Sequence, residues 1–274
     1  QAFGLLGTRY GVIGTLGWGF PGRLDVTAHT TPDAVSLQQM LARLRRDGAA
    51  GAALEVSSHA LKQGRVRAVR FETAIFTNLT HDHLDYHGSF EDYGASKQML
   101  FAFERLSHAV VNSDDPFGRR ILDALPRGVD ALSYGVADAG ARVRASEPVF
   151  SADGLVAQVE SPWGRGTLRT PLLGHFNLHN ALAALSAFLK YSSFGRRIRA
   201  TVQNRELAET LGVSTRNVDR ITFFLGSGLA GKFSALTPVS TPPADVLSGR
   251  SYSEERQNFA NWFTYYRRRE FVAR

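Results

Sequence analysis

The first 125 residues alternate short apolar runs with longer amphipathic stretches, and this alternation narrows the folds open to the chain. Short apolar runs predict buried strands, and the longer stretches predict helices that cover a sheet of mostly parallel strands. The pattern places strands at residues 10–14, 51–56, 73–78 and 109–112, and helices at residues 34–46 and 93–105. It therefore predicts an α/β fold.

The pattern changes between residues 142 and 172, where apolar and polar residues alternate in the short period of strands. Gly154 and Gly164 interrupt this stretch, and glycine is typical of the turns between strands. A helical pattern returns at residues 177–189. We therefore expect a small β subdomain followed by a helix.

The composition excludes several classes of protein. The chain has 274 residues, enough for one large or two modest domains, and it has no cysteine, which excludes disulfides and thiolate metal sites. It contains no run of about 18 apolar residues, and its start lacks the features of a signal peptide. We expect a cytoplasmic protein with no membrane partner.

The net charge of +7 is unevenly distributed. Residues 1–190 hold 19 Lys and Arg against 18 Asp and Glu, whereas residues 191–274 hold 13 against 7. A basic segment raises nucleic acid as a partner, but the first part is almost neutral. We therefore predict two regions, an α/β domain at 1–190 and a basic, mainly helical and irregular segment at 191–274.

The densest group of chemically active side chains lies at residues 80–88, where three His and two Asp directly follow the apolar run 74–76. The carboxyl ends of strands in open α/β sheets are where these folds bind ligands. One alternative is a polar loop whose histidines cap backbone groups. Another is a metallohydrolase that uses the cluster His81, His83, Asp85 and His87, which resembles a dinuclear zinc site.

Glu55 brings a second carboxylate to the end of another apolar strand, residues 52–54. Mg²⁺ prefers oxygen ligands and works beside phosphates. A carboxylate with one imidazole and several open positions therefore suits phosphoryl chemistry better than a structural metal site. The plainer interpretation of Glu55 is a charge at a helix N-terminus.

Two motifs, at residues 55–66 (EVSSHALKQGRV) and 77–88 (TNLTHDHLDYHG), resemble the central domain of Mur ligases. Within that family they are most similar to UDP-N-acetylmuramoyl-tripeptide synthetases, as are residues 14–20, 30–32, 112–116 and 174–180. The similarity runs from about residue 4 to residue 189. It implies a P-loop NTPase-like domain with a mostly parallel sheet.

The resemblance also implies a reaction. ATP phosphorylates the carboxylate of UDP-N-acetylmuramoyl-L-Ala-D-Glu, and the amine of a third amino acid, diaminopimelate or lysine, attacks the acyl phosphate to form an amide. By resemblance, Glu55 and His83 hold Mg²⁺, and Lys97 matches a lysine that CO₂ carbamylates. A carbamate replaces a cation with an anion, so its oxygen can coordinate the metal.

The remaining site residues follow from the same resemblance. Hydroxyl, amide and guanidinium groups suit an anionic UDP-muramoyl peptide, and the matching positions are Thr30, Thr31, Ser57, Gln63 and Arg65. Asn78, Asn177 and Asn180 match positions that lie near the nucleotide in the family. Asparagines at this spacing are more often surface or capping groups, so the assignment depends on the resemblance.

The chain departs from the family pattern at both ends. It lacks the glycine-rich loop ending in Gly-Lys-Thr that grips ATP phosphates, so we expect the isolated chain to bind ATP poorly. Beyond about residue 190 the match stops. Residues 205–220 resemble a helix-turn-helix, residues 226–249 read as a linker, and residues 255–269 resemble a motif of type IV pilus tip-associated assembly proteins.

A nucleic-acid-binding role for the basic residues 191–274 remains an alternative function. Basic and aromatic side chains can bind nucleic acid through phosphate contacts and stacking. An amphipathic helix with Phe259, Trp262, Phe263 and Tyr266 on one side accounts for the same residues more simply. We therefore do not expect nucleic acid as a partner.

Overall fold

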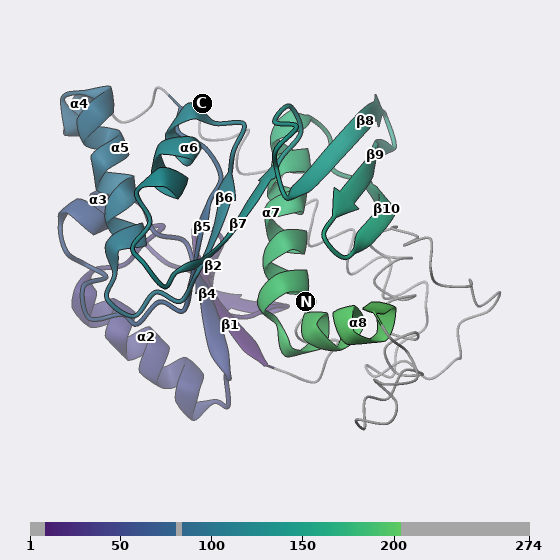
Figure 1. Ribbon diagram of the computed structural model, residues 1–274. Coiled ribbons are helices and arrows are strands. Elements are labelled where there is room, and N and C mark those ends of the chain that lie inside the picture. Colours follow the sequence, from purple (N-terminus) through teal and green to yellow (C-terminus); the bar gives the residue numbers. More distant parts are fainter. Residues whose placement is uncertain (1–8, 81–83, 204–274) are drawn as a thin grey trace. The chain divides into compact units, whose positions relative to one another are not determined.

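The computed structural model describes residues 9–80 and 84–203 (Figure 1). Within these residues the chain forms two compact units, the first with residues 9–74, 78–109 and 120–130, the second with residues 75–77, 110–119 and 131–203. The predictions for residues 205–220, 226–249 and 255–269 lie outside the described residues. The division of the chain at residue 190 stays a prediction.

The first unit contains a four-stranded sheet with the order β3-β2-β1-β4. Its strands are β1 (Tyr10–Gly14), β2 (Gly17–Phe20), β3 (Arg23–Asp25) and β4 (Gly51–Leu54). β1 is parallel to β4 and antiparallel to β2, which is in turn antiparallel to β3. The helices of this unit are α2 (Ala34–Arg46), α3 (Ser58–Lys62), α4 (Leu84–His87), α5 (Phe90–Gln98) and a 3₁₀ turn, η1 (Met99–Ala102).

Helix α2 confirms the sequence prediction at both ends. The Asp33 carboxylate accepts hydrogen bonds from the backbone N–H groups of Val35 and Ser36, both at 3.0 Å, and Gly48 with φ of 87° follows the last turn. The helix buries Leu37 and Leu44 in a core with Ile13 of β1. Truncating such a leucine to alanine costs roughly 2–5 kcal/mol.

A second sheet has the order β10-β9-β8-β7-β6-β5. Its strands are β5 (Thr73–Phe76), β6 (His108–Asn112), β7 (Asp130–Gly135), β8 (Val143–Ser151), β9 (Gly154–Ser161) and β10 (Gly164–Thr170). β7 and β8 are parallel, whereas β8, β9 and β10 are antiparallel. The remaining helices are α6 (Pro116–Asp123), α7 (His175–Tyr191) and α8 (Ser193–Gln203).

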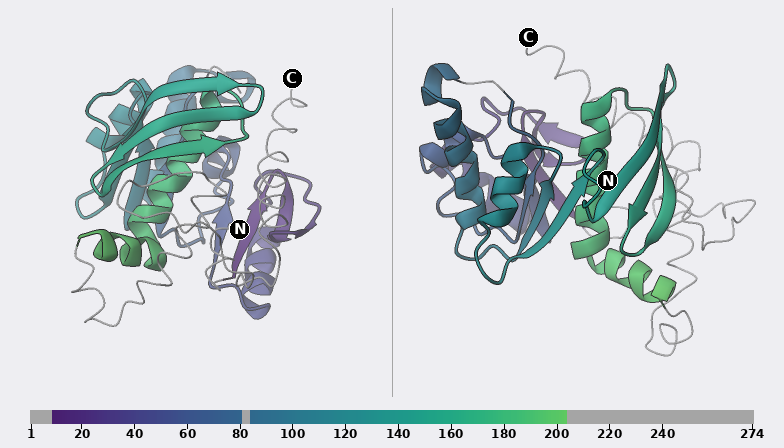
Figure 2. Two further views of the ribbon diagram at one scale, coloured as in Figure 1. Left: turned by 90° about the vertical axis from the view of Figure 1, so that its right-hand side faces the viewer. Right: turned by 45° about the horizontal axis from the view of Figure 1, so that its top comes forward.

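The predicted β subdomain is confirmed by β8, β9 and β10, which belong to the second unit. In both views of Figure 2, α7 lies along one face of these strands. Leu178 and Leu182 of α7 join a buried core with Val143, Leu155 and Val159. The turn glycine Gly154 has φ of 134°, and a Cβ there would lie 2.0 Å from the Thr170 carbonyl oxygen, so no larger residue fits.

Some element boundaries were predicted wrongly. The helix expected at residues 93–105 begins at Phe90, because Ser89 caps it by accepting from Asp92 N–H at 3.1 Å, and it changes to a 3₁₀ turn after Gln98. The strands expected at 51–56 and 73–78 end two residues early, at Leu54 and Phe76. Three of the four residues that follow carry polar side chains, namely Glu55, Thr77 and Asn78.

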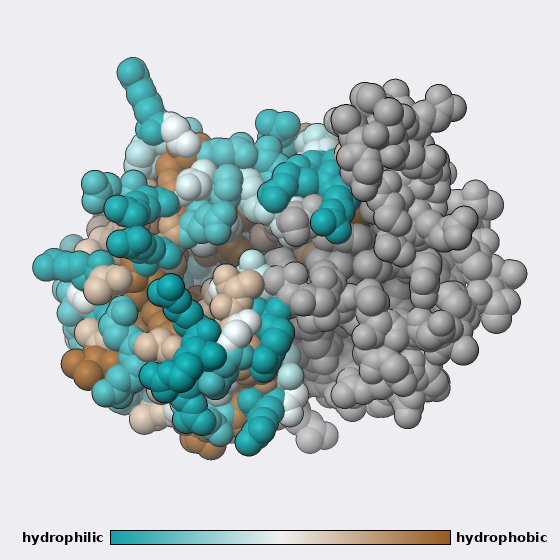
Figure 3. Space-filling view, turned by 90° about the horizontal axis from the view of Figure 1, so that it is seen from below, coloured by the Kyte–Doolittle hydropathy of each residue, from teal (hydrophilic) through white to brown (hydrophobic). Residues whose placement is uncertain are grey.

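The surface in Figure 3 is mainly hydrophilic where the described residues are visible, and apolar residues form small groups among charged ones. The exposed large apolar side chains include Val26 and Phe176, which are 89% and 62% exposed. None of the helices within residues 9–80 and 84–203 is long and apolar enough to cross a membrane.

Candidate active site

In the first unit, the Glu55 side chain lies against the turn that follows β1. Its Oε2 accepts from the backbone N–H of Thr15 at 2.7 Å and from the Thr15 hydroxyl at 2.8 Å. The Thr15 hydroxyl also meets the Thr30 hydroxyl at 2.8 Å, and since Thr15 donates to Glu55, Thr30 must donate to Thr15. A Cβ on Gly14 would lie 2.7 Å from Glu55 Oε2, so only glycine allows this approach.

The carboxylate of Glu55 is therefore held by one of its two oxygens. Among the described residues, no hydrogen bond to Oε1 is seen, which leaves that oxygen open to a ligand or a metal ion. A carboxylate oxygen is the type of ligand that Mg²⁺ prefers. The predicted metal ligand His83 lies outside the described residues.

Thr31 links the backbone of this region and is 1% exposed. Its hydroxyl donates to the Glu55 carbonyl oxygen at 2.7 Å and accepts from the Ser57 N–H at 2.9 Å. The Thr31 carbonyl oxygen accepts from Arg65 Nη1 at 2.9 Å. One buried threonine thus joins the segment after β2 and β3 to the segment after β4.

The hydrogen bonds continue from Arg65 to the side chains of Gln63 and Tyr86. Arg65 Nε donates to Gln63 Oε1 at 2.7 Å, and Gln63 Nε2 donates to the Tyr86 hydroxyl at 3.0 Å. The Ser57 hydroxyl accepts from the Ala60 N–H at 3.2 Å and so caps α3. All five residues predicted on the substrate side, Thr30, Thr31, Ser57, Gln63 and Arg65, are therefore connected to Glu55.

Sequence reasoning missed Thr15 and Tyr86 as members of this group. Thr15 follows the first strand directly, at the same kind of position that singled out Glu55 after β4. Tyr86 lies inside the His- and Asp-rich segment, where the charged residues give the stronger signal. Both could have been found by asking which hydroxyl groups follow strands or accompany charged motifs.

Lys97 lies near the end of α5. Its Nζ donates to the Asn78 backbone oxygen at 3.4 Å and lies 5.1 Å from the centre of the Tyr93 ring. The structure thus brings Lys97 together with the predicted nucleotide residue Asn78, through the backbone of Asn78. As a cation the Lys97 amine would repel Mg²⁺, so a role in holding metal requires a modified or neutral side chain.

His87 takes part in a buried polar cluster of the first unit. Its ring, 3% exposed, lies 2.9 Å through Nε2 from the Ser58 hydroxyl and 3.4 Å through Nδ1 from the Ser96 hydroxyl. A metal ligand needs a nitrogen directed at the ion, so these contacts argue against His87 as one. No group of three or more His, Cys, Asp or Glu that could hold a metal occurs among the described residues. His81 and His83, which the metallohydrolase alternative needs, lie outside them.

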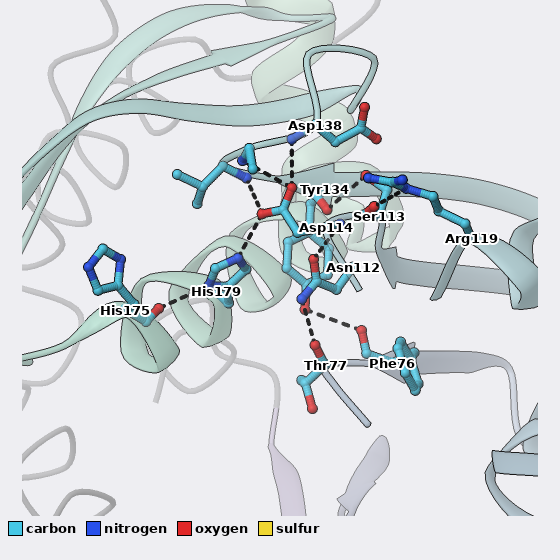
Figure 4. Close-up of polar contacts among 12 residues, drawn as sticks. Phe76, Thr77, Asn112, Ser113, Asp114, Arg119, Tyr134, Asp138, His175 and His179 are labelled. Carbon is cyan, nitrogen blue, oxygen red and sulfur yellow. Dashed lines mark hydrogen bonds and ion pairs between the residues drawn. The ribbon is translucent and has the colours of Figure 1, made fainter. Parts of the chain in front are cut away.

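In the second unit, Asp114 is the centre of a dense polar network (Figure 4). Its carboxylate accepts from the backbone N–H groups of Val136, Ala137 and Asp138 at 2.6, 3.0 and 2.7 Å, and from His179 Nε2 at 2.8 Å. Burial alone would raise the pKa of the Asp114 carboxyl, but these donors outweigh it and lower that pKa.

The network extends from Asp114 toward β5. The Asn112 side chain accepts from the Asp114 N–H at 3.0 Å and donates to the Thr77 carbonyl oxygen at 2.7 Å. The Tyr134 hydroxyl donates to the Phe76 carbonyl oxygen at 3.2 Å. Backbone that follows β5, β6 and β7 is therefore joined by side-chain hydrogen bonds.

The predicted nucleotide residues Asn177 and Asn180 lie one helical turn apart near the start of α7. The Asn177 amide donates to the Leu173 carbonyl oxygen at 2.8 Å. His179 lies between them in the sequence and donates through Nδ1 to the His175 carbonyl oxygen at 2.9 Å. Sequence reasoning did not anticipate the pairing of His179 with Asp114, which is 65 residues away.

Comparison with known proteins identifies this arrangement. The family model for the Mur ligase middle domain matches residues 3–188, which is more than half of the chain. The chain belongs to the Mur ligase family. The α/β fold with a mostly parallel sheet is confirmed by its likeness to solved Mur ligases.

Among its relatives are ligases named UDP-N-acetylmuramoyl-L-alanyl-D-glutamate--2,6-diaminopimelate ligase. The one from Ectopseudomonas mendocina is 50% identical over 189 residues, which are 69% of this chain and 39% of that protein. The one from Pseudomonas aeruginosa is 49% identical, with the same coverage. The chain thus spans about two-fifths of the length of these relatives.

Solved structures agree with this assignment. A structure of a ligase of the same name is 37% identical, has a TM-score of 0.63, and covers 68% of this chain and 38% of that one. MurF from Acinetobacter baumannii is 20% identical with a TM-score of 0.52 and covers 69% of this chain and 38% of that one, which shows the shared fold alone.

A second family model, for the permease component of a branched-chain amino acid transport system, matches residues 141–251. This match covers less than half of the chain and overlaps the Mur ligase match. In residues 141–203, the part of this range that the structure describes, the chain forms β8, β9, β10, α7 and α8, and none of these helices could cross a membrane.

Proposed function

We propose that the chain supplies the central domain of an ATP-dependent ligase that joins diaminopimelate to UDP-N-acetylmuramoyl-L-Ala-D-Glu. The observation that carries the proposal is the hydrogen-bonded chain from Thr15 through Glu55 and Thr31 to Arg65. It fixes one oxygen of Glu55 and leaves the other open. The names of the relatives support the choice of diaminopimelate as the third residue.

In the proposed reaction, ATP transfers its terminal phosphoryl group to the substrate carboxylate, and the incoming amine displaces phosphate to form the amide. Bound Mg²⁺ would neutralise charge on the phosphoryl oxygens. Glu55 Oε1 fits such an ion, and His83 and a carbamylated Lys97 would complete its protein ligands. Arg65 would contribute a positive charge that attracts the anionic peptide substrate.

The second unit would bind the nucleotide. Asn177 has a side-chain carbonyl oxygen with no hydrogen bond among the described residues, so it can accept one from an adenine amino group. Asn180 lies on the same face of α7. A reaction that consumes ATP further supports a cytoplasmic setting.

A chimera tests the proposal. Residues 3–188 of this chain would replace the matching region of the Pseudomonas aeruginosa ligase, so that the relative supplies its remaining domains. We expect this chimeric ligase to form the tripeptide precursor from ATP, diaminopimelate and the UDP-linked dipeptide. The Arg65→Ala chimera should raise the KM for the dipeptide about 10-fold.

Glu160→Gln provides the matched control, because Glu160 forms an exposed ion pair with Arg165 at 2.7 Å on β9 and β10 and lies outside the proposed site. Its activity should equal that of the unaltered chimera. A folded chimera without ATP-dependent amide formation would overturn the proposed function. Unchanged KM in Arg65→Ala would overturn the role of Arg65.

A further inference from the structure

The ring of His179 lies between two hydrogen-bond acceptors. Nε2 is 2.8 Å from Asp114 Oδ2, and Nδ1 is 2.9 Å from the His175 carbonyl oxygen. A carboxylate and a carbonyl oxygen can only accept, so both ring nitrogens must donate. Only the imidazolium form has two N–H groups, so both contacts are hydrogen bonds at the same time only when His179 is protonated and paired with the Asp114 anion.

The start of α7 lacks the usual means of fixing a helix end. Its N-cap is Gly174, which has φ of 89° and no side chain to bond the free N–H groups of the first turn. Phe176 in that turn is 62% exposed and contributes little packing. Leu178, which is buried in the core, and the polar contacts of the first two turns therefore define where this part of α7 lies.

Asp114 is a rigid anchor for this purpose. Three consecutive backbone N–H groups after β7 hold its carboxylate, and a Cβ on Gly135 would lie 2.7 Å from Oδ1, so the carboxylate has little room to move. The side chains of His179 and Asp114 are only 21% and 14% exposed. Water therefore screens their attraction less than it screens a surface ion pair.

We propose that the Asp114–His179 ion pair is a positioning device that holds the first two turns of α7 and thereby sets the orientation of Asn177 and Asn180 toward the nucleotide. This inference rests on the proposed function. Neither Asp114 nor His179 touches the nucleotide in this account. Their effect passes through the helix backbone, because His179 lies between the two asparagines.

The first test uses the full chain and does not require a nucleotide. In ¹⁵N NMR spectra at neutral pH, both ring nitrogens of His179 should show the chemical shifts of a protonated imidazolium. In Asp114→Asn, amide hydrogen exchange at residues 178–182 should become at least 10-fold faster, while residues 184–189 of the same helix change little. A neutral His179 ring, or unchanged exchange, would overturn the ion pair as a positioning device.

The second test measures the affinity of the chimeric ligase for ADP. His179→Gln keeps the Asp114 carboxylate and its three backbone donors, so the second unit should still fold, but it removes the charge and one of the two donors. We expect ADP to bind about 10-fold more weakly to Asp114→Asn and about 3-fold more weakly to His179→Gln. The double variant should be no weaker than Asp114→Asn, because both changes break the same link.

Two control variants separate positioning from general effects. Glu160→Gln removes one carboxylate from the second unit without touching α7, and Phe117→Leu loosens the packing of Phe117 against Phe76. Neither should change ADP affinity or exchange at residues 178–182. Equal losses in Phe117→Leu and Asp114→Asn would overturn the proposal, since general destabilisation would then explain both.

The two proposals can fail separately. If the unaltered chimera binds no ADP while His179 is doubly protonated and Asp114→Asn speeds exchange at residues 178–182, the nucleotide role under the proposed function is wrong and the ion pair still positions α7. If ADP binds with equal affinity to the unaltered chimera and to its Asp114→Asn variant, the positioning proposal is wrong and the nucleotide role stands.

Discussion

Glu55 in the first unit and Asp114 in the second are both carboxylates that follow a strand and press against a glycine. A Cβ on Gly14 would meet Glu55 Oε2 at 2.7 Å, and a Cβ on Gly135 would meet Asp114 Oδ1 at 2.7 Å. The two carboxylates differ in how many hydrogen bonds they accept. Glu55 accepts from Thr15 through one oxygen, whereas Asp114 accepts from three backbone N–H groups and from His179 through both oxygens.

This difference predicts different roles. A carboxylate with one open oxygen can still bind a metal or a substrate. A carboxylate whose two oxygens both accept hydrogen bonds from the protein mainly stabilises the fold. We therefore expect changes at Glu55 to lower activity and changes at Asp114 to lower stability first.

The largest expected effect is on the activity of the chimeric ligase when Glu55 becomes glutamine. Glu55→Gln keeps the size of the side chain and removes its charge, so kcat should fall on the order of 10³-fold, as for the loss of one electrostatic group in a preorganised site. The free energy of unfolding should change by less than about 1 kcal/mol. A variant that keeps its activity, or that loses mainly stability, would reverse the comparison.

The second prediction concerns the stability of the full chain. Asp114→Asn replaces the acceptor of three backbone N–H groups and leaves the His179 cation without its partner anion, so the free energy of unfolding should fall by about 2–3 kcal/mol. Urea denaturation measures it, with Glu160→Gln as the control that removes an exposed carboxylate of the same unit. A loss no larger than that of the control would contradict the assignment of Asp114 to fold stability.

The third prediction follows from the lowered pKa of Asp114. Because the folded pKa lies below the unfolded value of about 3.8, the stabilisation is fully present above that value and is lost as pH falls through the folded pKa. The difference in unfolding free energy between the unaltered chain and Asp114→Asn should therefore shrink as pH falls below about pH 4. The pKa of Asp33 is also lowered, but none of the causes of that shift involves Asp114, so its contribution cancels in the difference.

The contrast between the two carboxylates also marks what could be predicted from sequence. The apolar runs fixed the type of the main elements, since β1, α2 and β8–β10 depend on short-range periodicity and turn glycines. Glu55 was found because it directly follows an apolar run. The resemblance to Mur ligases added Thr30, Thr31, Ser57, Gln63 and Arg65, which the structure joins to Glu55.

The pairing of Asp114 with His179 could not be predicted in this way. The two residues are 65 positions apart and meet only because the segment after β6 lies beside α7. The N–H groups of residues 136–138 are also invisible in the sequence, because every residue except proline carries one. Periodicity predicts elements, but contacts between distant backbone and side-chain groups depend on how those elements pack.

The smallest expected effects come from the two glycines, and they sharpen the comparison most directly. Gly14→Ala pushes against the flexible end of Glu55, which can move aside at little cost in stability, but the movement displaces the open oxygen and should lower the activity of the chimeric ligase about 10-fold. Gly135→Ala pushes against a carboxylate that cannot move without breaking its backbone hydrogen bonds. It should lower the free energy of unfolding by about 1–2 kcal/mol and leave kcat close to that of the unaltered chimera. If both alanines lowered stability equally and neither lowered kcat, the two carboxylates would have the same structural role, and the distinction between them would be wrong.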